Sequence, residues 1–222
     1  MAQSVSLVKC LGTYAVQVLA LILAMGSLSR LAAQLGDGDF VSDSAVIRAG
    51  RVAPSWNVRD WINSPPLDLE QLQGKVVLMR FFSDSPQGAA ALNDFYRAYR
   101  QQGFVIVGFY TPQPMPSETD LGYVRRLVAA LEFEFPVAVD ARWETLNRYW
   151  LNEADADMGS ASFLLDRKGV IRAVQGRGLY DKNSPNRNVR RAYETLQRQI
   201  ETLLKESGPG AGSPNPPAGP AQ

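Results

Sequence analysis

The sequence contains no histidine, and it has a single cysteine among its 222 residues. Without histidine the chain lacks the side chain that proteins use most often as a general base and as a ligand for transition metals. The single cysteine, Cys10, cannot form an internal disulfide or a cysteine-rich zinc site. We therefore expect no metal and no cofactor, and a serine nucleophile would have no histidine to activate it.

The sequence also lacks a large net charge of either sign. The formal net charge is +1, with 23 Lys and Arg against 22 Asp and Glu, and the basic residues form no long run. A balanced chain of this kind does not steer nucleic acid toward itself, so nucleic acid is not an expected partner. Hydrophobic residues make up 45% of the sequence, which is enough to fill the core of about one domain.

One long apolar run lies near the amino terminus. Residues 10–28 read CLGTYAVQVLALILAMGSL and carry no charge, and about 20 such residues cross a bilayer. We interpret residues 1–30 as a transmembrane anchor or a signal segment. Lys9 on the amino-terminal side favours a single-pass arrangement with the domain on the outer, periplasmic or extracytoplasmic side. Cleavage near the small residues Ser27 and Ser29 would instead give a secreted or periplasmic protein, and a buried globular helix is a third reading.

Two further segments lack a periodic apolar pattern. Residues 31–52 are mixed in composition and are predicted to be a linker. Residues 207–222 read SGPGAGSPNPPAGPAQ, which is too poor in apolar side chains to offset the entropy of ordering, so this tail is predicted to be disordered. The folded domain is expected to occupy residues 53–206.

Within that domain, strand and helix patterns alternate. Continuous apolar runs at 75–82, 104–110 and 136–140 predict buried strands, and residues 162–166 and 170–174 flank a turn and predict a hairpin. Apolar residues at helical spacing between and after these runs predict helices, the last beginning at Ser184-Pro185. The order β-α-β-α-β-α-β-β-α predicts an α/β/α sandwich around a central mixed sheet.

These segments resemble, in order and spacing, the redoxin branch of the thioredoxin-like superfamily, which includes the TlpA-like and AhpC/TSA-like thiol-disulfide oxidoreductases. The matching pieces are "LQGKVVLMRFF", "GFVIVGFYTP", "FEFPVAVDARWETLNRYW" and "SFLLDRKGVIRAVQGRG". The resemblance runs from about Ala53 to Leu204, and it implies a thioredoxin-like three-layer fold and a role in cell redox homeostasis.

The same resemblance exposes a departure at the redox motif. Active relatives carry Cys-x-x-Cys just after the first of these strands, where a helix amino terminus stabilises the attacking thiolate. Here the junction contains no cysteine and is about four residues short, which suggests a deletion. The motif position falls on Asp84, Ser85, Pro86, Gln87, Gly88 and Ala89.

A second departure concerns the cis-proline that faces the motif in the family. Counting back from Phe163, that position falls on Ser160. Both halves of the family's site are therefore changed in this chain.

Other candidate site residues have simpler explanations beside the functional one. Ser85 and Asp84 can act as helix-cap or turn residues. Trp143, Tyr149 and Trp150 can contact a partner near the altered groove, or they can pack in the core, as their helical spacing also allows. Lys75 and Arg80 are expected to be edge or snorkelling charges. Asp155 and Asp157 lie in a polar loop, where cation binding competes with simple solvation.

The sequence thus predicts a membrane-tethered or exported thioredoxin-like domain that binds a protein partner or serves a structural role, without dithiol-disulfide activity and without catalytic residues. The alternative is a TlpA-like oxidoreductase that works with a thiol supplied by a partner. Whether the chain is an enzyme stays open at this point.

Overall fold

The computed structural model describes residues 49–116, 118–151, 161–176 and 179–206. Six strands form one sheet in the order β1-β4-β3-β2-β5-β6. The strands are β1 (Trp61–Ile62), β2 (Val76–Phe82), β3 (Phe104–Tyr110), β4 (Val137–Val139), β5 (Ala161–Leu165) and β6 (Ile171–Gly176). The helices are α3 (Ala89–Tyr99), α4 (Leu121–Ala130), α5 (Glu144–Leu146) and α6 (Arg187–Lys205), with a 3-10 turn at Arg100–Gln102 and a π-helical turn at Asn147–Leu151.

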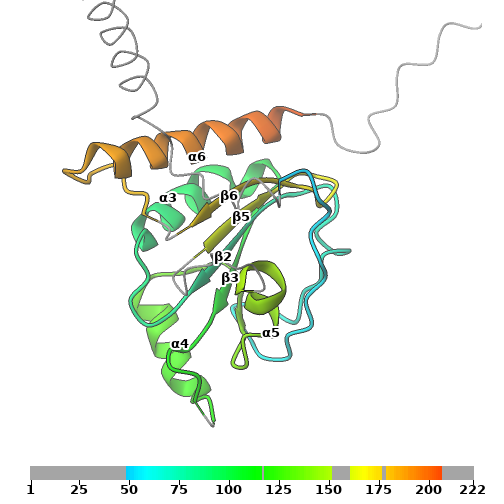
Figure 1. Ribbon diagram of the computed structural model, residues 1–222, viewed down its shortest axis with the longest axis vertical. Coiled ribbons are helices and arrows are strands. Elements are labelled where there is room, and N and C mark those ends of the chain that lie inside the picture. The colour runs from blue at the N-terminus through cyan, green and yellow to red at the C-terminus, as the bar shows by residue number, and fades with distance from the viewer. Residues whose placement is uncertain (1–48, 117, 152–160, 177–178, 207–222) are drawn as a thin grey trace, which may run out of the picture. The chain divides into compact units, whose positions relative to one another are not determined.

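The sheet is mixed, as the sequence predicts. Strand β2 runs parallel to β3, and β3 runs parallel to β4. The β5–β6 hairpin is antiparallel and pairs with the other side of β2, while β1 pairs antiparallel with β4. Strand β2 therefore has a neighbour on each side and lies near the middle of the sheet (Figure 1).

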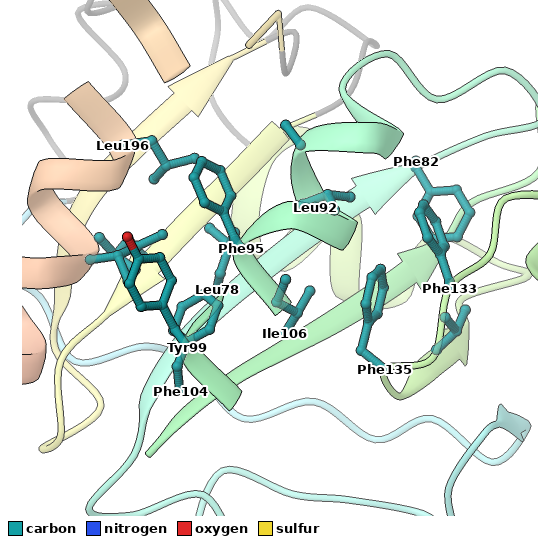
Figure 2. Packing of buried hydrophobic residues seen from close by; sticks show 14 of the residues in the cluster. Leu78, Phe82, Leu92, Phe95, Tyr99, Phe104, Ile106, Phe133, Phe135 and Leu196 are labelled. Carbon is teal, nitrogen blue, oxygen red and sulfur yellow. The ribbon is translucent and has the colours of Figure 1, made fainter. Parts of the chain in front are cut away.

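Each face of the sheet is covered by its own apolar cluster, because alternate residues of a strand point to opposite faces. On the first face, Leu78 and Phe82 pack with residues of α3, α4 and α6. Figure 2 shows Leu92, Phe95 and Tyr99 of α3 above the sheet, with Leu196 of α6 beside them. The second cluster joins Met79 and Phe81 of β2 to α5, to the π-helical turn and to the leading segment that contains Trp56.

On the first face, Phe82 of β2 packs closely against β3 because position 108 of β3 is a glycine. A Cβ atom at Gly108 would lie 3.0 Å from Phe82 Cε1, 3.2 Å from Val137 Cγ2 and 3.3 Å from Phe135 Cε2. Those distances are shorter than ordinary carbon–carbon contacts. Gly108 therefore lets the Phe82 ring lie directly on the neighbouring strand.

The closing helix α6 is anchored at its carboxyl end by Arg167 from the β5–β6 turn. The Arg167 guanidinium donates to the carbonyl oxygens of Leu204 (2.9 Å) and Glu206 (3.2 Å) and to that of Gly74 (2.7 Å), just before β2. A cation is favourable at this end of a helix, where the last carbonyl groups lack partners within the helix. This contact ties α6 to the start of the central strand.

Several details differ from the sequence expectations. Helix α6 is capped by Asn186 rather than beginning at Ser184-Pro185. The apolar segment around Trp143 forms the short α5 and a π-helical turn rather than one regular helix. There the buried Asp140 carboxylate accepts from the amides of Thr145 and Leu146.

The predicted membrane segment, the Pro/Gly-rich tail and most of the predicted linker lie outside the described residues. None of the helices that the structure describes is both long and apolar enough to span a bilayer. Residues at the end of the predicted linker pair with the hairpin, since the Gly50 amide donates to the Ile171 carbonyl (2.7 Å) and the Ile171 amide donates to the Arg51 carbonyl (2.8 Å).

Phe95→Ala tests the first apolar cluster. Phe95 is 1% exposed and stacks on Tyr193 at 4.7 Å between ring centroids, and removing a buried Phe side chain typically costs about 3–5 kcal/mol. Urea unfolding followed by circular dichroism should show a loss of that size. Arg97→Ala, at an exposed position on the same helix, should change the free energy of unfolding by less than about 1 kcal/mol. Equal losses in the two variants would contradict this assignment of the core.

Alkaline pH tests the buried tyrosines. Burial raises the pKa of Tyr149, whose hydroxyl donates to the Pro54 carbonyl, above its ordinary value. The unfolded chain releases this proton near pH 10 while the folded chain keeps it, so stability is full below about pH 10 and falls as pH rises further. Tyr149→Phe should flatten the fall in melting temperature between about pH 10 and 11.5, even though it lowers stability at pH 7. An unchanged alkaline slope would contradict the prediction.

Candidate functional site

The candidate site lies where β2 ends and α3 begins, at the carboxyl ends of the parallel strands. In open α/β sheets this is the edge at which ligands usually bind. The loop between the two elements, residues 83–88, holds the predicted motif position, and residues 111–116 leave the adjacent strand β3 at the same edge. The structure therefore brings the loops after β2 and β3 together.

The first turn of α3 has no internal cap. Gly88 is the N-cap residue with φ 79°, a left-handed conformation that glycine adopts without strain, and no side chain accepts a hydrogen bond there. The first turn contains no acidic residue. Ser85, predicted as a possible cap, lies three residues before the N-cap and does not cap the helix. The first amides of α3 are therefore left as donors at the positive end of the helix dipole.

Asp84 makes the most specific contact of the loop. Its carboxylate accepts a 2.7 Å hydrogen bond from the Tyr110 hydroxyl at the end of β3. Burial, together with this hydrogen bond, raises the pKa of Tyr110 above its ordinary value, so the phenol stays protonated near neutral pH. Asp84 thus holds the loop after β2 against β3 rather than capping α3.

Two exposed large apolar side chains belong to the segments that follow β3. Tyr123, at the start of α4, is 42% exposed, and Met115, in the loop after β3, is 44% exposed. Desolvation, followed by the neighbouring Asp84 carboxylate, raises the pKa of the Tyr123 hydroxyl, which places this hydroxyl beside Asp84. Tyr123 is thus an exposed aromatic side chain next to the loop after β2.

The environment of Arg80 differs from the sequence prediction. It was expected to be an edge or snorkelling charge, yet its side chain is 0% exposed within the central strand. Its Nη1 donates to Ser162 Oγ (3.2 Å), its Nη2 donates to the Gln87 carbonyl (3.0 Å), and its guanidinium carbon lies 5.5 Å from the centre of the Tyr180 ring. Burial lowers the pKa of the Arg80 guanidinium, and the nearby Tyr180 partly offsets this.

The three aromatic candidates, Trp143, Tyr149 and Trp150, differ in burial. Tyr149 and Trp150 are 0% and 3% exposed and belong to the second apolar cluster, which is the packing role that their spacing also allowed. Trp143 is only partly buried, and its Nε1 donates to the Pro112 carbonyl at 2.9 Å. It is the member of this group that lies next to the loop after β3.

Several residues singled out in the sequence lie outside the described ranges. Ser160 and the acidic loop with Asp155 and Asp157 lie outside the described residues, as does Cys10. The cis peptide bond within the described ranges is Gln113–Pro114. No group of three or more potential metal ligands occurs in the part of the chain that the structure describes.

A related sequence matches over much of the chain. The chain is 31% identical over 171 residues to Protein DipZ of Mycobacterium bovis, and it is equally similar to Protein DipZ of Mycobacterium tuberculosis. The alignment covers 72% of this chain but only 21% of DipZ, so the chain spans about a fifth of the length of these curated relatives.

Solved structures show the same fold. A candidate thiol:disulfide interchange protein DsbE from Chlorobium tepidum superposes with a TM-score of 0.53 at 23% identity, covering 70% of this chain and 97% of that one. A candidate protein disulfide isomerase from Bacteroides thetaiotaomicron gives 0.55 at 20% identity, covering 73% and 93%. The fold is therefore thioredoxin-like, as predicted.

The family model for AhpC/TSA proteins matches residues 49–174, more than half of the chain and nearly all of the sheet described above. The chain belongs to the AhpC/TSA family, within the thioredoxin-like redoxins that are related to thiol-disulfide oxidoreductases.

Proposed function

We propose that this thioredoxin-like domain binds a protein partner at the edge formed by the loops after β2 and β3, and that it does not exchange disulfides. The observation that carries the proposal is the start of α3. Dithiol exchange needs an attacking thiolate and a resolving thiol at this place, and the chain supplies Gly88, Ala89 and Ala90 there instead.

The surroundings of that position support binding. Met115 and Tyr123 present apolar surface to solvent, and Tyr110 and Asp84 fix the loop after β2 in place. Rigid loops with exposed aromatic or Met side chains form good interaction surfaces, because little entropy is lost when a partner orders them. Attachment to a membrane through residues 1–30, or export after their removal, belongs to the same proposal and would place the domain outside the cytoplasm.

Insulin-disulfide reduction by the full-length chain tests the lack of exchange. We expect no turnover above the dithiothreitol background, because one cysteine cannot complete the two-thiol cycle. Pro86→Cys combined with Ala89→Cys places two thiols at the start of α3 with two residues between them, and this variant should gain measurable turnover. Circular dichroism should show that both proteins are folded. Turnover by the unmodified chain would overturn the proposal.

Site-specific photo-crosslinking in cells tests the binding face. A photoreactive phenylalanine analogue introduced at Tyr123 or Met115 should give a discrete crosslinked product. The same analogue at Val52, which is also an exposed large apolar residue at 72% and pairs with Val170, provides the matched control. Val52 lies outside the loops after β2 and β3 and outside α4. Products of equal yield at all three positions, or at Val52 alone, would contradict a partner site at this edge.

A further inference from the structure

A buried positive charge, with no carboxylate partner among the described residues, lies beside the first turn of α3. Arg80 is fully buried in β2, and within the described part of the chain its contacts are a hydroxyl, a carbonyl and an aromatic ring, none of them a carboxylate. Buried charges in proteins are normally paired, because burial without a counter-charge is costly. Among the described residues, the groups that contact this guanidinium supply dipoles but no net negative charge.

One hydrogen-bond donor of the guanidinium is also unused. Arg80 Nε is buried and has no acceptor. In the planar guanidinium group, the Nε–H and one Nη2–H point in the same direction from one edge. Nη2 donates to the carbonyl of Gln87, the residue just before the N-cap of α3. The unused donor therefore belongs to the edge of Arg80 that faces the start of the helix.

The helix presents a second set of unused donors at that place. Among the described residues no acceptor pairs with the amides of Ala89, Ala90 or Ala91, whereas the Leu92 amide already donates to the Gly88 carbonyl. Gly88 has no side chain and Ala89 and Ala90 carry only a methyl group; Gly88 and Ala89 are partly exposed and Ala90 is exposed. Helix amino termini of this kind bind anions through their amides and their dipole.

We propose that the start of α3 binds an oxyanion, with the amides of its first turn as direct donors and Arg80 as the buried charge that completes the site. A guanidinium edge and a row of amides both match the planar or tetrahedral oxygens of carboxylate, phosphate and sulfate groups. Asp84, the acidic residue of the loop at 83–88, does not fill this role, because its carboxylate accepts from Tyr110 and no side chain caps α3.

This inference does not depend on the absence of disulfide exchange. It concerns the charge at the helix start, which is the same whether or not a thiol acts there. If the oxyanion is a carboxylate carried by a protein, the site adds a specific anchor to the proposed binding face. A free oxyanion would use the same donors.

Nuclear magnetic resonance titration of the full-length, ¹⁵N-labelled chain tests the site. Sodium sulfate and sodium acetate are added in separate series, with sodium chloride at matched ionic strength as the reference. We expect saturable shifts of the Ala89, Ala90 and Ala91 amides and of Arg80 Nε with at least one oxyanion. Saturation by acetate alone would identify a carboxylate, and saturation by sulfate would include tetrahedral oxyanions. Shifts no larger than those with chloride would overturn the proposal.

Two variants separate Arg80 from the general charge of the domain. Arg80→Met keeps a side chain of similar length without the charge and should weaken oxyanion binding at least tenfold. Arg97→Met removes the same charge from an exposed position near the other end of α3 and should leave binding within about twofold of the unmodified chain. Equal binding by the Arg80→Met variant would contradict the role of Arg80.

A third variant keeps the test decisive if Arg80→Met fails to fold. Ala90→Glu places a carboxylate on the first turn of α3, where it should compete with an added oxyanion and raise the melting temperature. Oxyanion binding should fall at least tenfold. A variant that binds sulfate and acetate as well as the unmodified chain would show that the anion does not lie at the start of α3.

Discussion

The guanidinium of Arg80 is the constraint around which the site is organised. Arg80 is fully buried in β2, one of the two middle strands of a six-stranded sheet, so groups from elsewhere in the chain supply the partners of its two Nη atoms. Ser162 comes from β5, Tyr180 from the segment after β6, and the Gln87 carbonyl from the loop before α3. These contacts fix the position of that loop relative to the sheet, and the Asp84–Tyr110 hydrogen bond fixes it from the other side.

The electrostatic character of the site follows from this arrangement. The positive end of the α3 dipole and the positive charge of Arg80 lie together, and each makes the other less favourable. In a redoxin with a thiol at this place, such a field would favour the thiolate. This chain keeps a positive field at the start of the helix without the thiol that would use it, and any group able to relieve the repulsion has to be an anion.

The sequence predicted the sheet well and the site less well, for different physical reasons. The runs that became β2 and β3 are apolar and fully covered on both faces, so their pattern is local and strong. Strand β1, with two residues, is too short to give a pattern, and the asparagine cap of α6 displaced an equally good serine-proline signal. Arg80 was misjudged because its partners Ser162 and Tyr180 lie about a hundred residues away in the sequence, where no local pattern reaches.

Binding and disulfide exchange make different demands on this edge of the sheet. Exchange requires a reactive thiolate and a resolving thiol, whereas binding requires exposed surface and fixed hydrogen-bond donors. In the proposed site, Met115 and Tyr123 supply the exposed surface, and the first amides of α3 supply fixed donors. The charge of the buried Arg80 adds to the attraction of an anion to those donors, because a charge acts over a longer range in a protein interior than in water. A partner carrying a carboxylate beside an apolar group would engage both features at once. The residues at the start of α3, which include no cysteine, are thus the ones on which the proposed recognition of an anion depends.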